Sequence, residues 1–439
     1  MIPVEIVRSH TILENGIDVV TDYAPNFQSV AVSASFRIGS VHEPDEKSGI
    51  SHLLEHLVFR GSKNRTGEEI QAAFSEFGGY LNAETDEDST NFVARILKDD
   101  LADSLQVIAD MVINPRLDDD DIRLEKQIIE QENCRGCYNC TMRDAFYAQA
   151  FPNQSIRNPV IGYEDTVKAL TQKDLQEYHR LAYVGKNLTV AVCGDIDHET
   201  VIKYVQAAFR NIPTGKAAGY PHFTYSPGEL LLGSNSDRST LRFGFPLTDF
   251  PIRQARAAIL YYDILGGHGQ SKLMYELREK RGLVYGVWAD EYNCAGQTIL
   301  FIEASGEAKN MPEISDVMIQ TMINTARNLQ DLDLDLAKKR AHSGMLMSLD
   351  DVFERCKAIQ ADIADQGRLY DWKKRYDEYQ SLTLDEVGKA GKEILKLEPT
   401  IIASGSMRNM PKFAEIRAKL KGKDISESKQ KQGLFGILN

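Results

Sequence analysis

Apolar and polar positions along the chain alternate in a pattern that occurs twice. In the first half, this pattern predicts in order a strand, two helices, a strand and a helix, at 30–36, 47–60, 67–77, 89–95 and 98–113. In the second half, it predicts a strand, two helices, a strand pair and a helix, at 240–245, 252–265, 270–280, 283–304 and 309–328. A long helix then follows a Leu-Asp-rich start in each half. Because strands and helices mix without strict alternation, we expect an α+β fold.

The length of 439 residues also favours two lobes, since single cores rarely grow to this size. A stretch rich in glycine, proline and small residues, typical of an exposed linker, separates the two similar halves. We therefore expect an N-terminal lobe at 1–214, a linker at 215–228 and a C-terminal lobe at 229–439.

Composition excludes several classes of partner. The net charge of −13 disfavours binding to phosphate backbones, so we expect no nucleic acid. No run of about 18 apolar residues predicts a membrane span. The first 15 residues lack the pattern of a secretory or transit peptide, so we expect a cytoplasmic protein. The six cysteines are then expected to be reduced.

Candidate chemistry centres on residues 51–59, SHLLEHLVF. His52 and His56 are four residues apart, so both imidazoles project from one helix face and suit one Zn²⁺ ion. Glu55 lies beside them, within reach of a metal-bound water. The order His-x-x-Glu-His is the inverzincin motif. Such a short string also arises by chance on solvated helices, but the apolar residues on both sides favour a functional site.

A third protein ligand is expected from the helix-forming stretch 121–135. It holds three carboxylates, of which Glu125 and Glu132 are two turns apart on one face, whereas Glu130 points elsewhere. Spacing leaves both Glu125 and Glu132 open as the ligand, with the other one in a supporting position.

These motifs resemble the pitrilysin family of zinc metallopeptidases, peptidase family M16, over nearly the whole chain. Residues 49–62 are similar to the family's metal helix, and 125–132 to its Glu-x₆-Glu stretch, in which the second glutamate binds the metal. The resemblance implies one Zn²⁺ per chain held by His52, His56 and Glu132, with Glu125 in support. It also implies two α/β-sandwich-like lobes, LuxS/metallohydrolase-like and related by internal duplication.

Two further elements carry the resemblance. Residues 78–85, GGYLNAET, are similar to the family's edge segment that pairs with substrate, which assigns Asn82 and Ala83 to peptide binding. Residues 271–285 are similar to its Arg-x₆-Tyr element, which assigns Arg278 and Tyr285 to substrate contact and catalysis. Taken alone, an arginine on a helix and a tyrosine at a strand start are usually solvated and core residues.

The resemblance implies an endopeptidase that hydrolyses peptides enclosed between its lobes, with Glu55 activating a zinc-bound water. It also implies a homodimer, or a heterodimer with a paralogous subunit. The alternative is a non-catalytic or partner-dependent subunit of a heterodimeric peptidase, for example in precursor-peptide maturation. The run Cys134, Cys137 and Cys140 departs from the family. We interpret these cysteines as unligated thiols rather than as a metal-cluster site or redox sensor.

Overall fold

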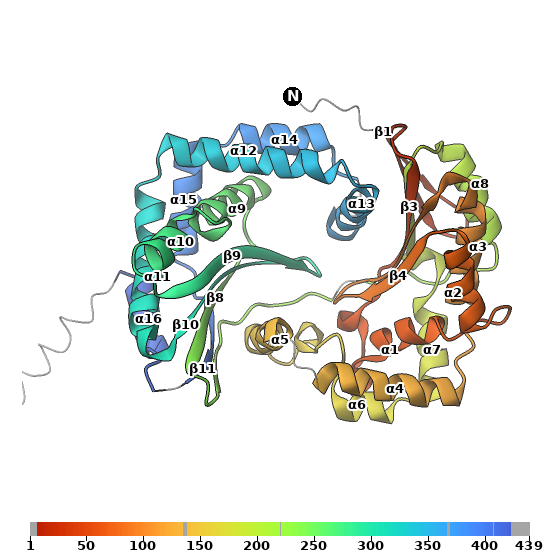
Figure 1. The fold of residues 1–439 in the computed structure, drawn as a ribbon, viewed down its shortest axis with the longest axis horizontal. Coiled ribbons are helices and arrows are strands. Elements are labelled where there is room, and N and C mark those ends of the chain that lie inside the picture. The colour runs from red at the N-terminus through yellow and green to blue at the C-terminus, as the bar shows by residue number, and fades with distance from the viewer. Residues whose placement is uncertain (1–6, 135–137, 220, 367–368, 407, 423–439) are drawn as a thin grey trace, which may run out of the picture. The chain divides into compact units, whose positions relative to one another are not determined.

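The protein is described from a computed structural model over residues 7–134, 138–219, 221–366, 369–406 and 408–422. The chain divides into two compact units, each assembled from three segments (Figure 1). The first unit comprises Met1–Thr141, Asn153–Phe223 and Gly344–Lys373. The second comprises Met142–Pro152, Thr224–Ser343 and Lys374–Asn439.

The first unit is built on a six-stranded sheet of order β1-β2-β6-β3-β5-β4. Its strands are β1 (Val7–Ile12), β2 (Asp18–Tyr23), β3 (Ser29–Phe36), β4 (Tyr80–Thr85), β5 (Thr90–Leu97) and β6 (Leu188–Gly194). The β2–β6 pair is parallel, and the other neighbouring pairs are antiparallel. Strand β4 lies at one edge of this sheet, so one side of its backbone is not paired within the sheet.

Helices cover both faces of this sheet. They are α1 (Ile50–Val58), α2 (Gly67–Glu76), α3 (Leu101–Ile113), α4 (Asp119–Cys134), α6 (Glu164–Ala169), α7 (Gln172–Ala182), α8 (His198–Ala208) and α13 (Val352–Gln366). Alternate residues of β3 serve the two faces: Val30 and Val32 join the main core with α1 and α3, whereas Ala31 packs under α13. The almost uninterrupted burial of β3 follows from this double cover.

The second unit is built on a five-stranded sheet of order β7-β11-β8-β10-β9. Its strands are β7 (Glu229–Gly233), β8 (Arg238–Pro246), β9 (Val284–Cys294), β10 (Gln297–Glu307) and β11 (Thr400–Gly405). Its helices, three of which have one end in a segment of the first unit, are α5 (Tyr138–Ala150), α9 (Ile252–Gly266), α10 (Lys272–Met274), α11 (Met311–Arg327), α12 (Asp331–Ser348), α14 (Trp372–Gln380), α15 (Leu384–Ile394) and α16 (Phe413–Leu420). A π-helical turn, Tyr275–Glu279, continues α10.

The two sheets repeat one topology, which confirms the two-lobed α+β fold and the internal duplication expected from the sequence. Strands β2, β6, β3, β5 and β4 correspond in order and direction to β7, β11, β8, β10 and β9. In both units one parallel pair is followed by antiparallel neighbours. Strand β1 is an addition at the edge of the first sheet.

Each unit takes one helix from the other half of the chain. Helix α13 packs on β3 and β6 of the first unit, through Val352, Ile359 and Ile363. The main part of α5, from Met142, belongs to the second unit. There the Phe146 ring meets that of Phe301 with 4.6 Å between centroids. A Cβ at Gly244 would overlap the Phe146 ring, so this glycine makes room for α5. The expected boundaries, 1–214 and 229–439, assign each lobe one continuous segment. They therefore do not account for this exchange of α5 and α13 between the two halves of the chain.

Buried ion pairs hold α13 on the first unit. The guanidinium of Arg355 donates to Asp22 of β2, and both side chains are almost inaccessible to water. Arg8 of β1 donates to Asp22 and to Asp362 of α13, at 3.1 Å in each case. Charges buried to this degree are tolerated because they are paired and hydrogen-bonded.

Within the described residues, no helix is both long enough and apolar enough to cross a membrane.

We predict that Arg355→Met lowers the free energy of unfolding of the first unit by about 3 kcal/mol, because Asp22 keeps its charge in a buried position with one cation fewer. Urea unfolding followed by circular dichroism measures this loss. The double variant with Asp22→Asn is expected to recover part of it, since the uncompensated charge is gone. Equal stability of Arg355→Met and the wild type would contradict a stabilising role for the pair.

Candidate metal centre

Helix α1 has an apolar face that packs in the core and a second face that carries the two histidines. Leu53, Leu54, Leu57 and Val58 are buried in the main core, whereas His52 and His56 are only partly buried. This division follows the helical period of the sequence and sets the rotation of α1 about its own axis. Both imidazoles therefore point away from the core on the same side, as expected from their spacing.

The start of α1 is held by Glu43, a residue that the sequence analysis did not identify. Its carboxylate accepts hydrogen bonds from the backbone N–H groups of Gly49, at 2.7 Å, and Ser51, at 2.8 Å. These are donors that a helix start leaves unpaired. Gly49 adopts φ +93°, which brings the chain into the helix at a sharp angle that side-chain-bearing residues rarely allow. The position of His52 thus depends on Glu43, six residues before Gly49.

Helix α4 brings a carboxylate to the two imidazoles. The His52 and His56 rings have 4.6 Å between centroids. One ligand atom from each of His52, His56 and Glu132 lies within 4.8 Å of the other two. Over the described ranges, this is the only such group of three or more His, Cys, Asp or Glu side chains. Two imidazoles and a carboxylate are a donor set typical of zinc sites.

Glu125 lies on the other side of His56. Its Oε2 is 2.8 Å from Nδ1 of His56, and its other oxygen accepts from Arg60. This contact leaves Nε2 of His56 directed to Glu132, 3.8 Å from that carboxylate. A carboxylate that binds the second ring nitrogen of a ligand histidine sets its tautomer and orientation. Burial acts to lower the pKa of His56, but the bond to Glu125 and the neighbouring carboxylates outweigh it and raise that pKa.

His52 shows that these residues fit a metal ion. Its Nδ1 is buried and has no hydrogen-bond partner among the described residues, so none of their contacts at this atom holds the ring. Burial, with the nearby charge of His56, lowers the pKa of His52 to about 4. The imidazole is therefore neutral at pH 7, the form that binds a metal.

Glu55 connects the metal helix with the edge strand β4. Its Oε2 accepts a hydrogen bond of 3.0 Å from Oγ1 of Thr85, the last residue of β4. Burial raises the pKa of Glu55, although His56 and the bond to Thr85 act against this rise. The carboxylate is thereby suited to take up and release a proton.

An open pocket of about 1020 Å³ lies against this group in the first unit. Glu55, His56 and Glu125 line it from the helices, and Leu81 and Asn82 line it from β4. Along β4, Tyr80, Asn82 and Glu84 are exposed, whereas Leu81 and Ala83 are partly buried. The predicted substrate residue Asn82 thus shares a pocket with the predicted base, and Ala83 is its neighbour on the same edge strand.

Arg278 and Tyr285 lie together in the second unit. The Cζ atom of Arg278, on the π-helical turn, is 5.5 Å from the centroid of the Tyr285 ring at the start of β9. Tyr285 is 76% exposed, so it is not the core residue that a tyrosine at a strand start usually is. A π-helical turn widens a helix by one residue and is frequent at functional sites.

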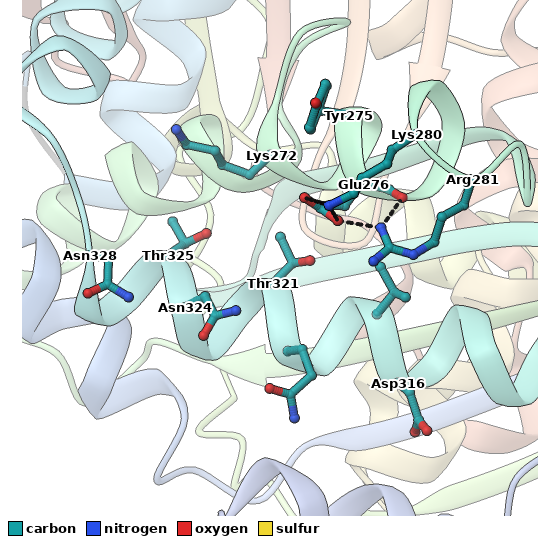
Figure 2. A pocket seen from close by; sticks show the side chains of 12 residues that line it. Lys272, Tyr275, Glu276, Lys280, Arg281, Asp316, Thr321, Asn324, Thr325 and Asn328 are labelled. Carbon is teal, nitrogen blue, oxygen red and sulfur yellow. Dashed lines mark hydrogen bonds and ion pairs between the residues drawn. The ribbon is translucent and has the colours of Figure 1, made fainter.

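A separate pocket of about 520 Å³, lined mostly by charged and polar residues, lies beside this turn (Figure 2). On one wall of the pocket Glu276 pairs with both Lys280 and Arg281, and Asn324 and Thr325 of α11 line the other wall. Neither Arg278 nor Tyr285 lines this pocket. Lys280 and Arg281, which follow the turn, pair with Glu276, whereas Arg278 lies 3.7 Å from the carboxylate of Glu279.

Comparisons with protein-family models identify the family of this chain. The family model described as insulinase, peptidase family M16, matches residues 18–164, which include α1 and α4. The model described as peptidase M16 inactive domain matches residues 169–341. The chain belongs to peptidase family M16. Within this M16 chain, the group of His52, His56 and Glu132, which could hold a metal ion, lies in the part matched by the insulinase model.

Relatives and solved structures agree with this assignment. An uncharacterised zinc protease of Rickettsia felis is 26% identical over 359 residues, 81% of this chain and 87% of the relative. One from Mycobacterium tuberculosis is 25% identical over 420 residues, 93% and 95% of the two chains.

Two crystal structures share the fold. A protease from Helicobacter pylori has a TM-score of 0.84 at 22% identity, covering 91% of this chain and 99% of its own. A Pseudomonas fluorescens protein described as a peptidase M16 inactive domain has 0.83 at 17% identity, covering 92% and 100%. Both show the same two-lobed M16 fold.

Sequence reasoning missed three residues that shape this M16 site: Glu43, Arg60 and Thr85. Thr85 lies within the edge segment 78–85, so its position next to Asn82 and Ala83 was a usable signal. Arg60 carried none because its partner, Glu125, is distant in sequence. Glu43 carried none because it precedes α1 in a segment without helical or strand periodicity. The side chains of Cys134, Cys137 and Cys140 lie outside the described part of the structure.

Glu43 leads to a prediction about pH. Burial raises its pKa from 4.5 to about 7, against the hydrogen bonds from Ser51 and Gly49. Between these two values the folded chain binds more protons than the unfolded chain, so this residue makes the free energy of unfolding fall as the pH rises. The fall amounts to about 3 kcal/mol at most.

The side chain in the variant Glu43→Gln does not titrate. It has one acceptor oxygen, so one of the two hydrogen bonds to the backbone is lost at every pH. We expect the stability advantage of the wild type over this variant to shrink between pH 5 and pH 8. Urea unfolding of both proteins with a chelator present measures the difference without a contribution from metal binding. A difference that stays constant over this range would contradict the prediction.

Proposed function

We propose that this M16 chain is a zinc-dependent endopeptidase in which His52, His56 and Glu132 hold one Zn²⁺ ion and Glu55 is the general base. The observation that carries the proposal is the convergence of two imidazoles and one carboxylate within 4.8 Å, beside a buried glutamate. The names of the relatives, zinc proteases, support the choice of metal and reaction.

Zinc in such a site lowers the pKa of a bound water and polarises the carbonyl of a peptide bond. Glu55 then removes the proton from the attacking water and passes it to the leaving amine. Thr85 orients the Glu55 carboxylate through one oxygen, so the other oxygen is available for the proton. Glu125 keeps the Nδ1 proton of His56 in place and leaves Nε2 as the ligand atom.

The edge strand β4 is proposed to bind the substrate backbone. An extended peptide adds to such an edge through main-chain hydrogen bonds, which accept many sequences. Support comes from Asn82, which lines the same pocket as Glu55 and His56. Arg278 and Tyr285 are proposed, from the family resemblance, to contact the peptide, with Tyr285 donating a hydrogen bond to the oxyanion.

The base assignment is tested with Glu55→Gln. Hydrolysis of a generic fluorogenic peptide is expected to fall by ~10²–10⁴-fold, because the water keeps its proton. Zinc content by elemental analysis should stay near one ion per chain, since Glu55 is not a ligand. Glu68→Gln is the matched control, because Glu68 is exposed and lines the same pocket. Undiminished hydrolysis by Glu55→Gln would exclude this role.

The same assay separates the enzyme from the partner-dependent subunit. Hydrolysis by the purified chain alone, abolished by a chelator and restored by zinc, supports a self-sufficient peptidase. Zinc near one per chain with hydrolysis only after addition of a paralogous subunit supports the heterodimer instead. A chain without zinc would contradict both the metal site and the proposed reaction.

The oxyanion role is tested with Tyr285→Phe, which keeps the ring beside Arg278 and removes only the hydroxyl. A loss of ~10²–10³-fold in kcat is expected if this hydroxyl stabilises the transition state. Zinc content and melting temperature should not change, because Tyr285 is exposed. Tyr275→Phe, at another exposed tyrosine of the same unit, is the control. If both variants retain full kcat, Tyr285 has no such role.

A further inference from the structure

Two buried thiols meet where α13 packs on the sheet of the first unit. Cys193 belongs to β6 and Cys356 to α13, and their Sγ atoms are 2.9 Å apart although 163 residues separate them in sequence. Both cysteines are free and buried. The Sγ of Cys356 also lies 3.5 Å from the carbonyl oxygen of Ala31 on β3.

The sulfur atoms are close to bonding distance. A disulfide holds its sulfurs ~2.05 Å apart, so closing the bond requires a movement of about 1 Å. Two features keep the thiols facing each other: the apolar cluster around Val20, Ala191 and Ile359, and the pairing of Arg355, next to Cys356, with Asp22. The pair is therefore oriented by α13 packing and not by chance surface contact.

The surroundings also decide which oxidants can act. Burial, together with the neighbouring thiol, raises the pKa of Cys193 well above its usual value, so the thiolate is scarce while α13 is packed. Bulky reagents have no access to a buried thiol. A small peroxide can reach the thiols when α13 loosens briefly. Repacking of the helix then brings the second thiol to the oxidised sulfur.

We propose that Cys193 and Cys356 form a redox modification site, in which a small peroxide produces an intrachain disulfide that locks α13 onto β6. A thiolate attacks one peroxide oxygen and becomes a sulfenic acid, releasing hydroxide. The second thiol attacks that sulfur, so the S–S bond forms, the S–O bond breaks and water leaves. The two sulfurs lose two electrons in total, and hydrogen peroxide is reduced to two molecules of water.

The lock acts on an unusual part of the chain. Segment 344–373 belongs to the first unit, whereas the chain before and after it belongs to the second. In the reduced protein, noncovalent contacts hold α13 on the sheet. A disulfide adds a covalent attachment that lasts until a thiol reductant cleaves it. Neither cysteine belongs to the metal-ligand group, so the inference does not depend on peptide hydrolysis.

The test compares reduced and peroxide-treated full-length protein. Free thiols are alkylated in denaturant, and the digest is searched for one species joining the peptides of Cys193 and Cys356 with the loss of two hydrogens. Oxidation should also raise the melting temperature by roughly 5–10 °C, because the bond closes a long loop. Amide exchange in α13 should slow at least ~10-fold, because local opening becomes restricted. A thiol reductant should reverse all three effects.

Matched variants separate this pair from the other cysteines. Cys356→Ala should give no linked species and no shift in melting temperature on peroxide treatment, whereas Cys294→Ala, at another buried cysteine, should respond like the wild type. If Cys356→Ala does not fold, the presence or absence of the linked Cys193–Cys356 peptides in the peroxide-treated wild type still tests the proposal. Recovery of both peptides as alkylated thiols, or links confined to Cys134, Cys137 and Cys140, would overturn the proposal.

Discussion

Two imidazoles one helical turn apart can serve one ion only if their helix is held in position and in rotation. Helix α1 meets this requirement from several directions. Its leucines pack in the core, and Glu43 holds its first backbone N–H groups. Glu55 attaches it to β4 through Thr85, and His56 attaches it to α4 through Glu125. The whole site is arranged around this helix of nine residues.

The geometry of the site depends on both local and distant interactions. The spacing of His52 and His56 is local, since it follows from the helical period alone. The approach of the Glu132 carboxylate depends instead on a distant interaction, the packing of α4 against α1. The site thus combines a rigid pair of donors with a carboxylate whose placement relies on the packing of a second helix, and the Glu125 contact is what couples the two helices.

Local and distant interactions also explain how far the sequence could predict the structure. Apolar periodicity predicted the repeated order of strands and helices, because each element must bury one face. It could not choose between Glu125 and Glu132, which share one face of α4; the structure places Glu125 on His56 and Arg60, and Glu132 with both imidazoles. It also could not assign α5 and α13 to their units, since an amphipathic pattern specifies a buried face and not its partner.

The exchanged helix has a consequence for synthesis on the ribosome. Strand β6 ends at Gly194, yet α13 covers it only after residue 366 has been made. At ~5–20 residues per second, the interval is on the order of ten seconds or more. Throughout that time Val20, Ala31, Ala191 and Cys193 form an uncovered apolar face on the nascent chain. The N-terminal half therefore completes its folding late, and it offers chaperones a defined surface until the C-terminal half supplies the missing helix.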